Sequence, residues 1–89
     1  MVKVVSVRQQ EARGLGHAVL CAKELIGDEP FVVLLGDDLV DASVPCSKQM
    51  IDVYNKYQKS VVALLRVSDD DVPKFGICGG HATADRVYQ

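Results

Sequence analysis

The sequence has little that would suit it to a membrane or to nucleic acid. Its longest apolar runs, residues 31–35 and 61–65, are far shorter than the roughly 20 residues that cross a bilayer. Met1–Val7 lacks the long apolar region of a signal peptide. The formal net charge is -2, so no global positive field attracts nucleic acid. We therefore expect a cytoplasmic protein that binds neither membranes nor nucleic acid.

Cysteine is scarce, and its spacing supports neither a metal finger nor a disulfide framework. Cys21, Cys46 and Cys78 form no C-x-x-C pair, and no histidine lies at a metal-finger interval from them. Because free cysteine packs as a small hydrophobe, we expect three buried free thiols. A structural zinc site and a disulfide remain the alternatives.

The residues that are present suit a small α/β domain. The chain has 89 residues, of which 48% are hydrophobic, so one domain over residues 1–89 is the most that it can form. Four segments have the β-branched or apolar composition of strands, and two have apolar residues spaced three and four apart, as in helices. The expected strands are 2–7, 31–35, 61–67 and 84–88, with a short extended piece at 76–78, and the expected helices are 15–26 and 47–59.

This order, β-α-β-α-β-β-β, predicts a largely parallel sheet with two helices and a short C-terminal hairpin. The run 31–35 is continuously apolar, which is typical of a strand covered on both faces of a parallel sheet. In the helix at 47–59, Met50, Ile51, Tyr54 and Tyr57 are expected on one side. Sheets of this kind bind ligands beyond the carboxyl ends of their strands, which indicates residues 9–16, 36–38 and 67–76.

Glycines open the first expected helix, at Gly14 and Gly16. They let a ligand approach the backbone, and the helix start offers N–H groups to an electronegative atom. Turn formation alone is the alternative, because the third glycine of the dinucleotide-binding pattern is missing. His17 follows this loop and is expected to be a structural hydrogen-bond donor that lines a pocket, while His81 beside Gly79–Gly80 is expected to be exposed.

Two carboxylates, Asp37 and Asp38, follow the apolar strand directly. One or two carboxylates with substrate phosphates suffice to hold Mg²⁺; an Asx turn or a helix cap is the alternative. The acidic run 69–71 has loop composition and is interpreted as a solvated tip. We expect Asp37 and Gly14 to share one pocket. No serine, cysteine or histidine arrangement indicates a covalent nucleophile.

Several spaced motifs resemble the bacterial UTP-glucose-1-phosphate uridylyltransferases, within the sugar-phosphate nucleotidyltransferase family. The resemblance covers roughly residues 3 to 80. A phenylalanine, Phe75, stands where the family usually has tyrosine. The motifs are VRQ (7–9), GLGHAVLCA (14–22), GDEPF (27–31), VLLGDDL (33–39) and KFGIC (74–78).

The resemblance implies a partial Rossmann-like nucleotidyltransferase core and an enzyme that makes UDP-glucose and pyrophosphate from UTP and glucose 1-phosphate with Mg²⁺. It implies that Gln9 and the backbone at Gly14 recognise uracil, and that Asp37 binds Mg²⁺. It further implies that Asp38 lies near the ribose or the sugar and that Gly76 lets the backbone approach the glucose hydroxyls. In-line displacement needs positioning and charge neutralisation more than covalent help.

The family's phosphate-binding signature and its downstream sugar and metal residues do not match any part of residues 1–89, and the resemblance fades after Gly80. We therefore expect a truncated domain with weak UTP or UDP-glucose binding and without full activity. One alternative is a non-catalytic module that forms homo-oligomers through an exposed sheet edge. Another is a stand-alone enzyme of new specificity. The residues present do not fix the base or the sugar.

Overall fold

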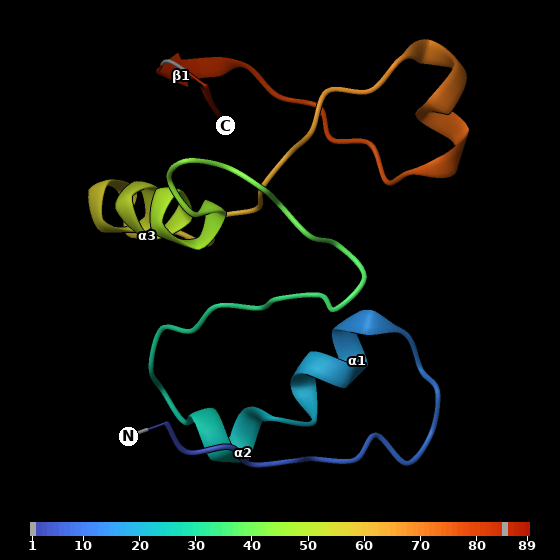
Figure 1. The fold of residues 1–89 in the computed structure, drawn as a ribbon, viewed down its shortest axis with the longest axis vertical. Helices are drawn as coiled ribbons and strands as arrows, with labels where there is room; N and C mark the ends of the chain where they lie inside the picture. Colours follow the sequence, from blue (N-terminus) through green and yellow to red (C-terminus); the bar gives the residue numbers. More distant parts are fainter. Residues whose placement is uncertain (1, 85) are drawn as a thin grey trace.

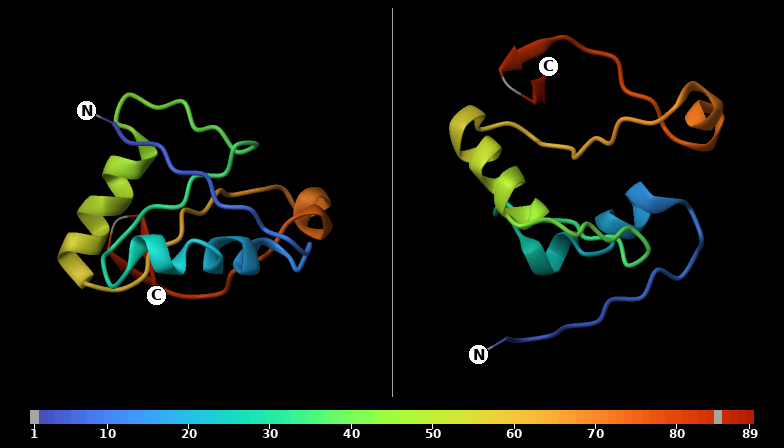
Figure 2. Two further views of the ribbon diagram at one scale, coloured as in Figure 1. Left: turned by 90° about the horizontal axis from the view of Figure 1, so that it is seen from below. Right: turned by 45° about the horizontal axis from the view of Figure 1, so that its top comes forward.

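The computed structural model of the chain describes residues 2–84 and 86–89. Three α-helices come first, α1 (Leu15–Leu20), α2 (Lys23–Ile26) and α3 (Cys46–Tyr57). A 3-10 helix, η1 (Asp69–Lys74), and two short strands, β1 (Ala82–Ala84) and β2 (Val87–Tyr88), follow. Long uncoiled segments join the helices (Figure 1, Figure 2). Each described helix is too short or too polar to cross a bilayer.

The expected first helix is present as two short pieces. Ala22 donates its N–H to Val19, three residues back, at 3.1 Å, and this tighter turn separates α1 from α2. Gly27 ends α2 with a positive φ of 68°, a conformation that glycine adopts without a Cβ clash. The sequence pattern therefore located the helical region correctly, but a single helix over 15–26 was wrong.

Helix α3 confirms the expected amphipathic helix at 47–59, with one change in its faces. Cys46, Met50, Val53, Tyr54 and Tyr57 are half-buried. Ile51 lies on the exposed side, contrary to the expectation. The helix ends at Gln58, which has left-handed backbone angles and donates its N–H to the Tyr54 carbonyl at 2.7 Å. Local periodicity was sufficient to predict this element.

The sheet differs most from the expectation. Within residues 2–84 and 86–89 the structure has one antiparallel pair, β1 with β2, in the register Ala82 to Tyr88 and Ala84 to Val87, where a largely parallel sheet was expected. Segments 2–7, 31–35 and 61–67 are not helical, and none of them forms the ladder of hydrogen bonds that defines a strand. A parallel ladder needs a neighbouring strand from a distant segment to accept and donate its hydrogen bonds, and these segments are not paired. The parallel order therefore stays a prediction.

The C-terminal hairpin forms, but at other residues than expected. His81 and Gln89 close it with reciprocal backbone bonds of 3.0 and 2.8 Å. Ala84 belongs to β1, Arg86 lies in a turn and Val87 begins β2, so the segment 84–88 is not the one strand that was expected. The piece at 76–78 is unpaired, and residue 85 of the expected strand lies outside the described residues. His81 is exposed, as expected.

The chain is open, and this explains where burial was predicted wrongly. Its radius of gyration is 15.4 Å, where a compact chain of this length has about 12 Å. It exposes 8620 Å², against about 5,100 Å² for a compact chain of the same mass. No described residue is fully buried. The run 31–35 is exposed rather than covered, and Cys21, Cys46 and Cys78 are free but only partly buried or exposed.

Candidate functional site

Among the residues of the expected site, those in the loop before α1 form side-chain hydrogen bonds with one another. The Gln9 side-chain amide donates to the Gly14 carbonyl at 3.2 Å. The same amide nitrogen lies 2.9 Å from Nδ1 of His17. Gln9 and His17 are both half-buried. The structure thus brings together Gln9 and Gly14, the two residues expected to recognise the base, through a direct hydrogen bond.

Gly14 can hold this geometry because it has no side chain. Its backbone angles are φ 94° and ψ 175°, a region that is essentially restricted to glycine. In this conformation its carbonyl accepts from both Gln9 and the Ala18 N–H, the latter at 3.2 Å. The loop conformation and the first turn of α1 therefore depend on the same carbonyl. The backbone conformation of the loop therefore requires glycine at position 14, independently of any contact with a ligand.

His17 has a contact that the sequence did not predict. It was expected to be a donor, but its Nδ1 faces the amide nitrogen of Gln9, which is itself a donor, so Nδ1 accepts. Cys21, one helical turn further on, has its Sγ 3.9 Å from the same Nδ1. The signal in the sequence was the spacing of His17 and Cys21, four residues apart on one helix face. The loop geometry that adds Gln9 has no such signal.

A shallow hollow of about 710 Å³ lies beside this contact, between the loop and the first two helices. His17 is part of its wall, as expected for a pocket-lining residue. Arg13 pairs with Glu11 at its rim, with 2.7 Å from Nε to Oε2. Both side chains are well exposed, so this pair contributes little to stability. The wall also contains Arg8, Gln10, Lys23 and Glu24, with the apolar Val7 and Leu20.

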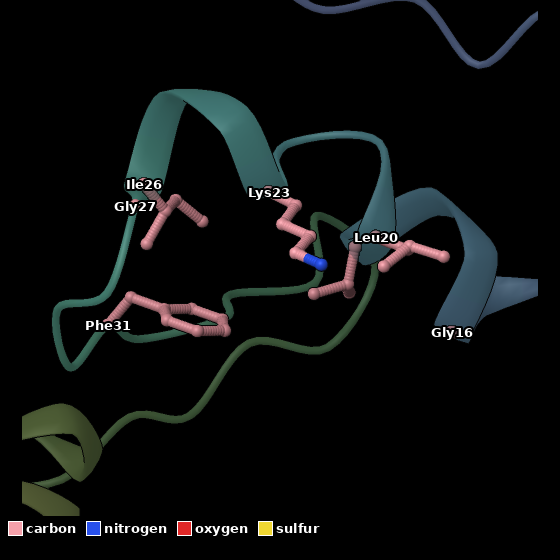
Figure 3. Close-up of a pocket in the computed structure, with 7 residues that line it drawn as sticks. Gly16, Leu20, Lys23, Ile26, Gly27 and Phe31 are labelled. Carbon is pink, nitrogen blue, oxygen red and sulfur yellow. The ribbon is translucent and has the colours of Figure 1, made fainter.

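A smaller, apolar hollow of about 240 Å³ lies where α1 and α2 face Phe31 (Figure 3). Val19, Leu20 and Ile26 line it together with the aromatic ring, and Lys23 reaches across it. Phe31 is the first residue of the apolar run 31–35 and remains 55% exposed. At this hollow the apolar side chains of the first two helices face the start of the apolar run 31–35.

The carboxylates occupy a separate turn. Asp37 lies in a turn closed by the Asp38 N–H and the Leu35 carbonyl at 3.2 Å, and both aspartates are exposed. Neither of the two hollows described above is lined by Asp37, Asp38 or Gly76. The pocket expected to join Asp37 with Gly14 stays a prediction. It would require the ends of two strands to meet at one sheet edge, and those strands are unpaired here.

Gly76 follows η1, which lies toward the other end of the long axis from α1 and α2 (Figure 1). The acidic run before it is a 3-10 helix rather than the expected loop. Ser68 and Lys74 donate to the Asp71 carboxylate at 3.0 and 2.9 Å. The Lys74 bond, then the Ser68 bond, lower the pKa of Asp71 below its ordinary value of 3.8. Asp69 and Asp70 are exposed, in accord with a solvated tip.

Among the described residues, no group of three or more histidine, cysteine or acidic side chains is arranged to hold a metal ion. A closed metal cage is therefore not formed by residues 2–84 and 86–89. Mg²⁺ does not need such a cage, since it retains several waters and uses one or two carboxylates with substrate phosphates. The exposed carboxylate of Asp37 fits that mode of binding.

Comparison with known proteins decides the family. A family model described as nucleotidyl transferase matches residues 1–88. The chain belongs to the nucleotidyl transferase family. No solved structure matches it. Membership in this family implies an α/β fold, in agreement with the fold class expected from the sequence.

Three curated relatives that the chain resembles are uridylyltransferases. The chain is 48% identical over 83 residues to UTP–glucose-1-phosphate uridylyltransferase YngB of Bacillus subtilis (strain 168), which covers 93% of the chain. A second uridylyltransferase of that strain is 45% identical over the same length. UTP–glucose-1-phosphate uridylyltransferase of Staphylococcus epidermidis is 40% identical over all 89 residues. These matches confirm the resemblance stated from the motifs. The chain spans only 28% to 31% of the length of these relatives.

Proposed function

We propose that this nucleotidyl transferase family chain supplies the uridine contacts, one metal-binding carboxylate and part of the sugar site for the synthesis of UDP-glucose in the cytoplasm. Its identity of 40% to 48% to uridylyltransferases along nearly its whole length carries the proposal. The contact between Gln9 and Gly14 supports it locally. The chain alone has little or no turnover, because the matching relatives are more than three times as long.

The chemistry is a displacement at the α-phosphorus of UTP. An oxygen of glucose 1-phosphate attacks, a new phosphorus–oxygen bond forms, and pyrophosphate leaves with the electrons of the broken bond. Gln9 and Gly14 hold the uracil edge. Asp37 binds Mg²⁺, which neutralises phosphate charge when present. Asp38 lies near the ribose or sugar, and Gly76 offers backbone to the glucose hydroxyls.

The same proposal includes the sheet. Segments 2–7, 31–35 and 61–67 are uncoiled and apolar, and we assign them to the parallel strands of the Rossmann-like core. Their carboxyl ends would then place residues 9–16, 36–38 and 67–76 at one edge. Pairing of this kind, with helices on both faces of the sheet, would bury the exposed side chains of all three runs.

The test is nucleotide binding to the isotope-labelled chain by NMR. UTP with Mg²⁺ should shift the Gln9 side-chain amide and the Gly14 backbone amide. Asp37→Asn should abolish the Mg²⁺ dependence of these shifts, whereas Asp70→Asn, in the solvated tip, should retain it. Equal Mg²⁺ dependence in both variants would contradict the role of Asp37.

A pyrophosphate-release assay over several nucleotide and sugar-phosphate pairs tests the expected lack of turnover. UTP with glucose 1-phosphate, and every other pair, should give no sustained release from the 89-residue chain. Sustained release with any pair would contradict the limited activity. Release with a pair other than UTP and glucose 1-phosphate would favour a stand-alone enzyme of new specificity.

A second candidate function, self-association, is favoured by the exposure of the apolar runs. Leu34 is 77% exposed and Leu65 is 86% exposed, and their segments carry no ladder hydrogen bonds. Unpaired apolar strands invite pairing with another chain. Sedimentation should therefore show a homodimer or larger species. Leu34→Lys should weaken it more than Leu39→Lys, a change that lies outside the run and after the turn at 36–37. A monomer at all concentrations would exclude this function.

A further inference from the structure

The Gln9 amide is held in one orientation by its two neighbours. The Gly14 carbonyl can only accept, so the nitrogen side of the amide must face it, at 3.2 Å. The same nitrogen lies 2.9 Å from His17 Nδ1. Its two N–H groups are therefore both engaged. Among the described residues, no hydrogen bond is made by the Gln9 side-chain oxygen, which is left to accept from a ligand.

This arrangement specifies the state of His17. For Nδ1 to accept from the amide, the ring must be neutral with its proton on Nε2. The Cys21 thiol faces the same nitrogen at 3.9 Å and is only a weak donor. The neutral ring therefore acts as a fixed acceptor for Gln9.

We propose that His17 is a positioning residue that determines base selection by controlling which edge of the Gln9 amide faces the ligand. The inference rests on the proposed uridine contact of Gln9. With its oxygen outward, Gln9 accepts from a base edge that offers a ring N–H, as uracil does at N3. Cytosine presents an unprotonated N3 at that position, so two acceptors would oppose each other.

Protonation of His17 removes this selection. The imidazolium carries a proton on Nδ1 that opposes the amide N–H, and the Gly14 carbonyl keeps the nitrogen side of the amide in place, so the contact between ring and amide breaks. The Gln9 amide is then no longer held with its oxygen toward the ligand, and the preference for uracil over cytosine falls. Histidine changes charge between about pH 5 and pH 8. His17 also lines the shallow hollow between the loop and the first two helices. The other charged and titratable groups that line this hollow are Arg8, Glu11, Arg13, Cys21, Lys23 and Glu24.

The first experiment uses the ligand-free, isotope-labelled chain. When the pH is lowered from 8 to 5.5, the Gln9 side-chain NH₂ resonances should move in step with those of the His17 ring, while those of Gln10 should not. His17→Asn should keep the Gln9 resonances near their position at pH 8, because the Asn oxygen replaces Nδ1, and should remove the pH dependence. His17→Phe should displace them at every pH. Gln9 resonances that ignore the His17 titration would overturn the proposal.

The second experiment compares UMP and CMP, which share one phosphate, so that its own titration cancels in the ratio of affinities. At pH 8 the chain should prefer UMP by about tenfold, the worth of one satisfied hydrogen bond against one unsatisfied group. The ratio should approach one at pH 5.5. His17→Asn should keep the preference at both values, and His17→Phe should lose it at both. A preference that survives His17→Phe would also overturn the proposal.

The two experiments separate failure of the inference from failure of the proposed function. If neither nucleotide binds, the uridine contact fails for this chain, and the ligand-free titration alone decides whether His17 orients Gln9. If UMP binds with no effect of His17 on the Gln9 resonances, the uridine contact stands and the positioning role is wrong. The amide signals of α3 serve as the control for folding in each variant.

Discussion

Substituting Gly14 tests whether the loop before α1, which we propose contacts uridine, depends on the backbone conformation of this glycine. Gly14 has φ 94° and ψ 175°, and a Cβ placed there meets no atom within 4 Å. Any penalty for Gly14→Ala therefore arises from the backbone conformation and not from a steric neighbour. Conformations of this class cost a non-glycine residue on the order of 1 to 3 kcal/mol. That penalty corresponds to a decrease in the population of the loop conformation of about fivefold to somewhat over a hundredfold.

Gly16 provides the matched control. It lies two residues away inside α1, and a Cβ there also meets no atom within 4 Å. Because alanine has the higher helix propensity, by up to about 1 kcal/mol, Gly16→Ala should strengthen the helix. The two variants add the same methyl group and should act in opposite directions. This removes side-chain size as an explanation.

The assay is NMR of both variants with and without UMP. Gly14→Ala should shift the Gln9 side-chain amide toward its solvent-exposed position and weaken UMP binding in proportion to the lost population. Gly16→Ala should leave both unchanged or improved. Wild-type Gln9 resonances and UMP affinity in Gly14→Ala would refute the reasoning, as would equal damage from the two changes.

Two further predictions concern the second half of the chain. A Cβ on Gly80 would lie 2.6 Å from the Gln89 carbonyl oxygen, so Gly80→Ala should speed amide exchange at the hairpin closure. Gly79 has open space around it, so Gly79→Ala should not change the exchange. Equal exchange in the two variants would contradict this prediction. Because the Lys74 and Ser68 bonds lower the pKa of Asp71, its stabilising effect on η1 is complete above its ordinary pKa and is lost as the pH falls through the lowered value. Carbon-detected titration of the Asp71 carboxyl should show this, and a value at or above 3.8 would contradict it.

The sequence predicted the elements that depend on nearby residues. Met50, Tyr54 and Tyr57 recur at spacings of three and four, and this periodicity located α3 because helix hydrogen bonds join residues four apart. The same reasoning located the helical region at 15–26. It missed the break near Ala22, whose N–H donates to the carbonyl three residues back and not to the one four residues back. This change in hydrogen bonding does not alter the spacing of the apolar residues, so the sequence pattern could not predict it.

Strands could not be verified in the same way. The apolar run at 31–35 predicts a strand from its composition, yet a strand of a parallel sheet exists only when a distant segment supplies its hydrogen-bond partners. Here that run and 61–67 are uncoiled and unpaired. Burial was overestimated for the same reason, since Leu34 can be covered only by neighbouring strands and a helix on each face. The errors in burial and in the thiol environment thus share one cause, the missing strand pairs.

The site divides along the same line between local and distant contacts. Gln9, Gly14 and His17 lie within nine residues of one another, and their hydrogen bonds form without any strand pairing. The metal and sugar residues, Asp37 and Gly76, can join them only through the edge of a parallel sheet. The uridine contact should therefore tolerate a loss of strand pairing, and the Mg²⁺ dependence should weaken before the uridine contact does. An open chain whose Mg²⁺ binding is tight and whose response to UMP is absent would be incompatible with this division.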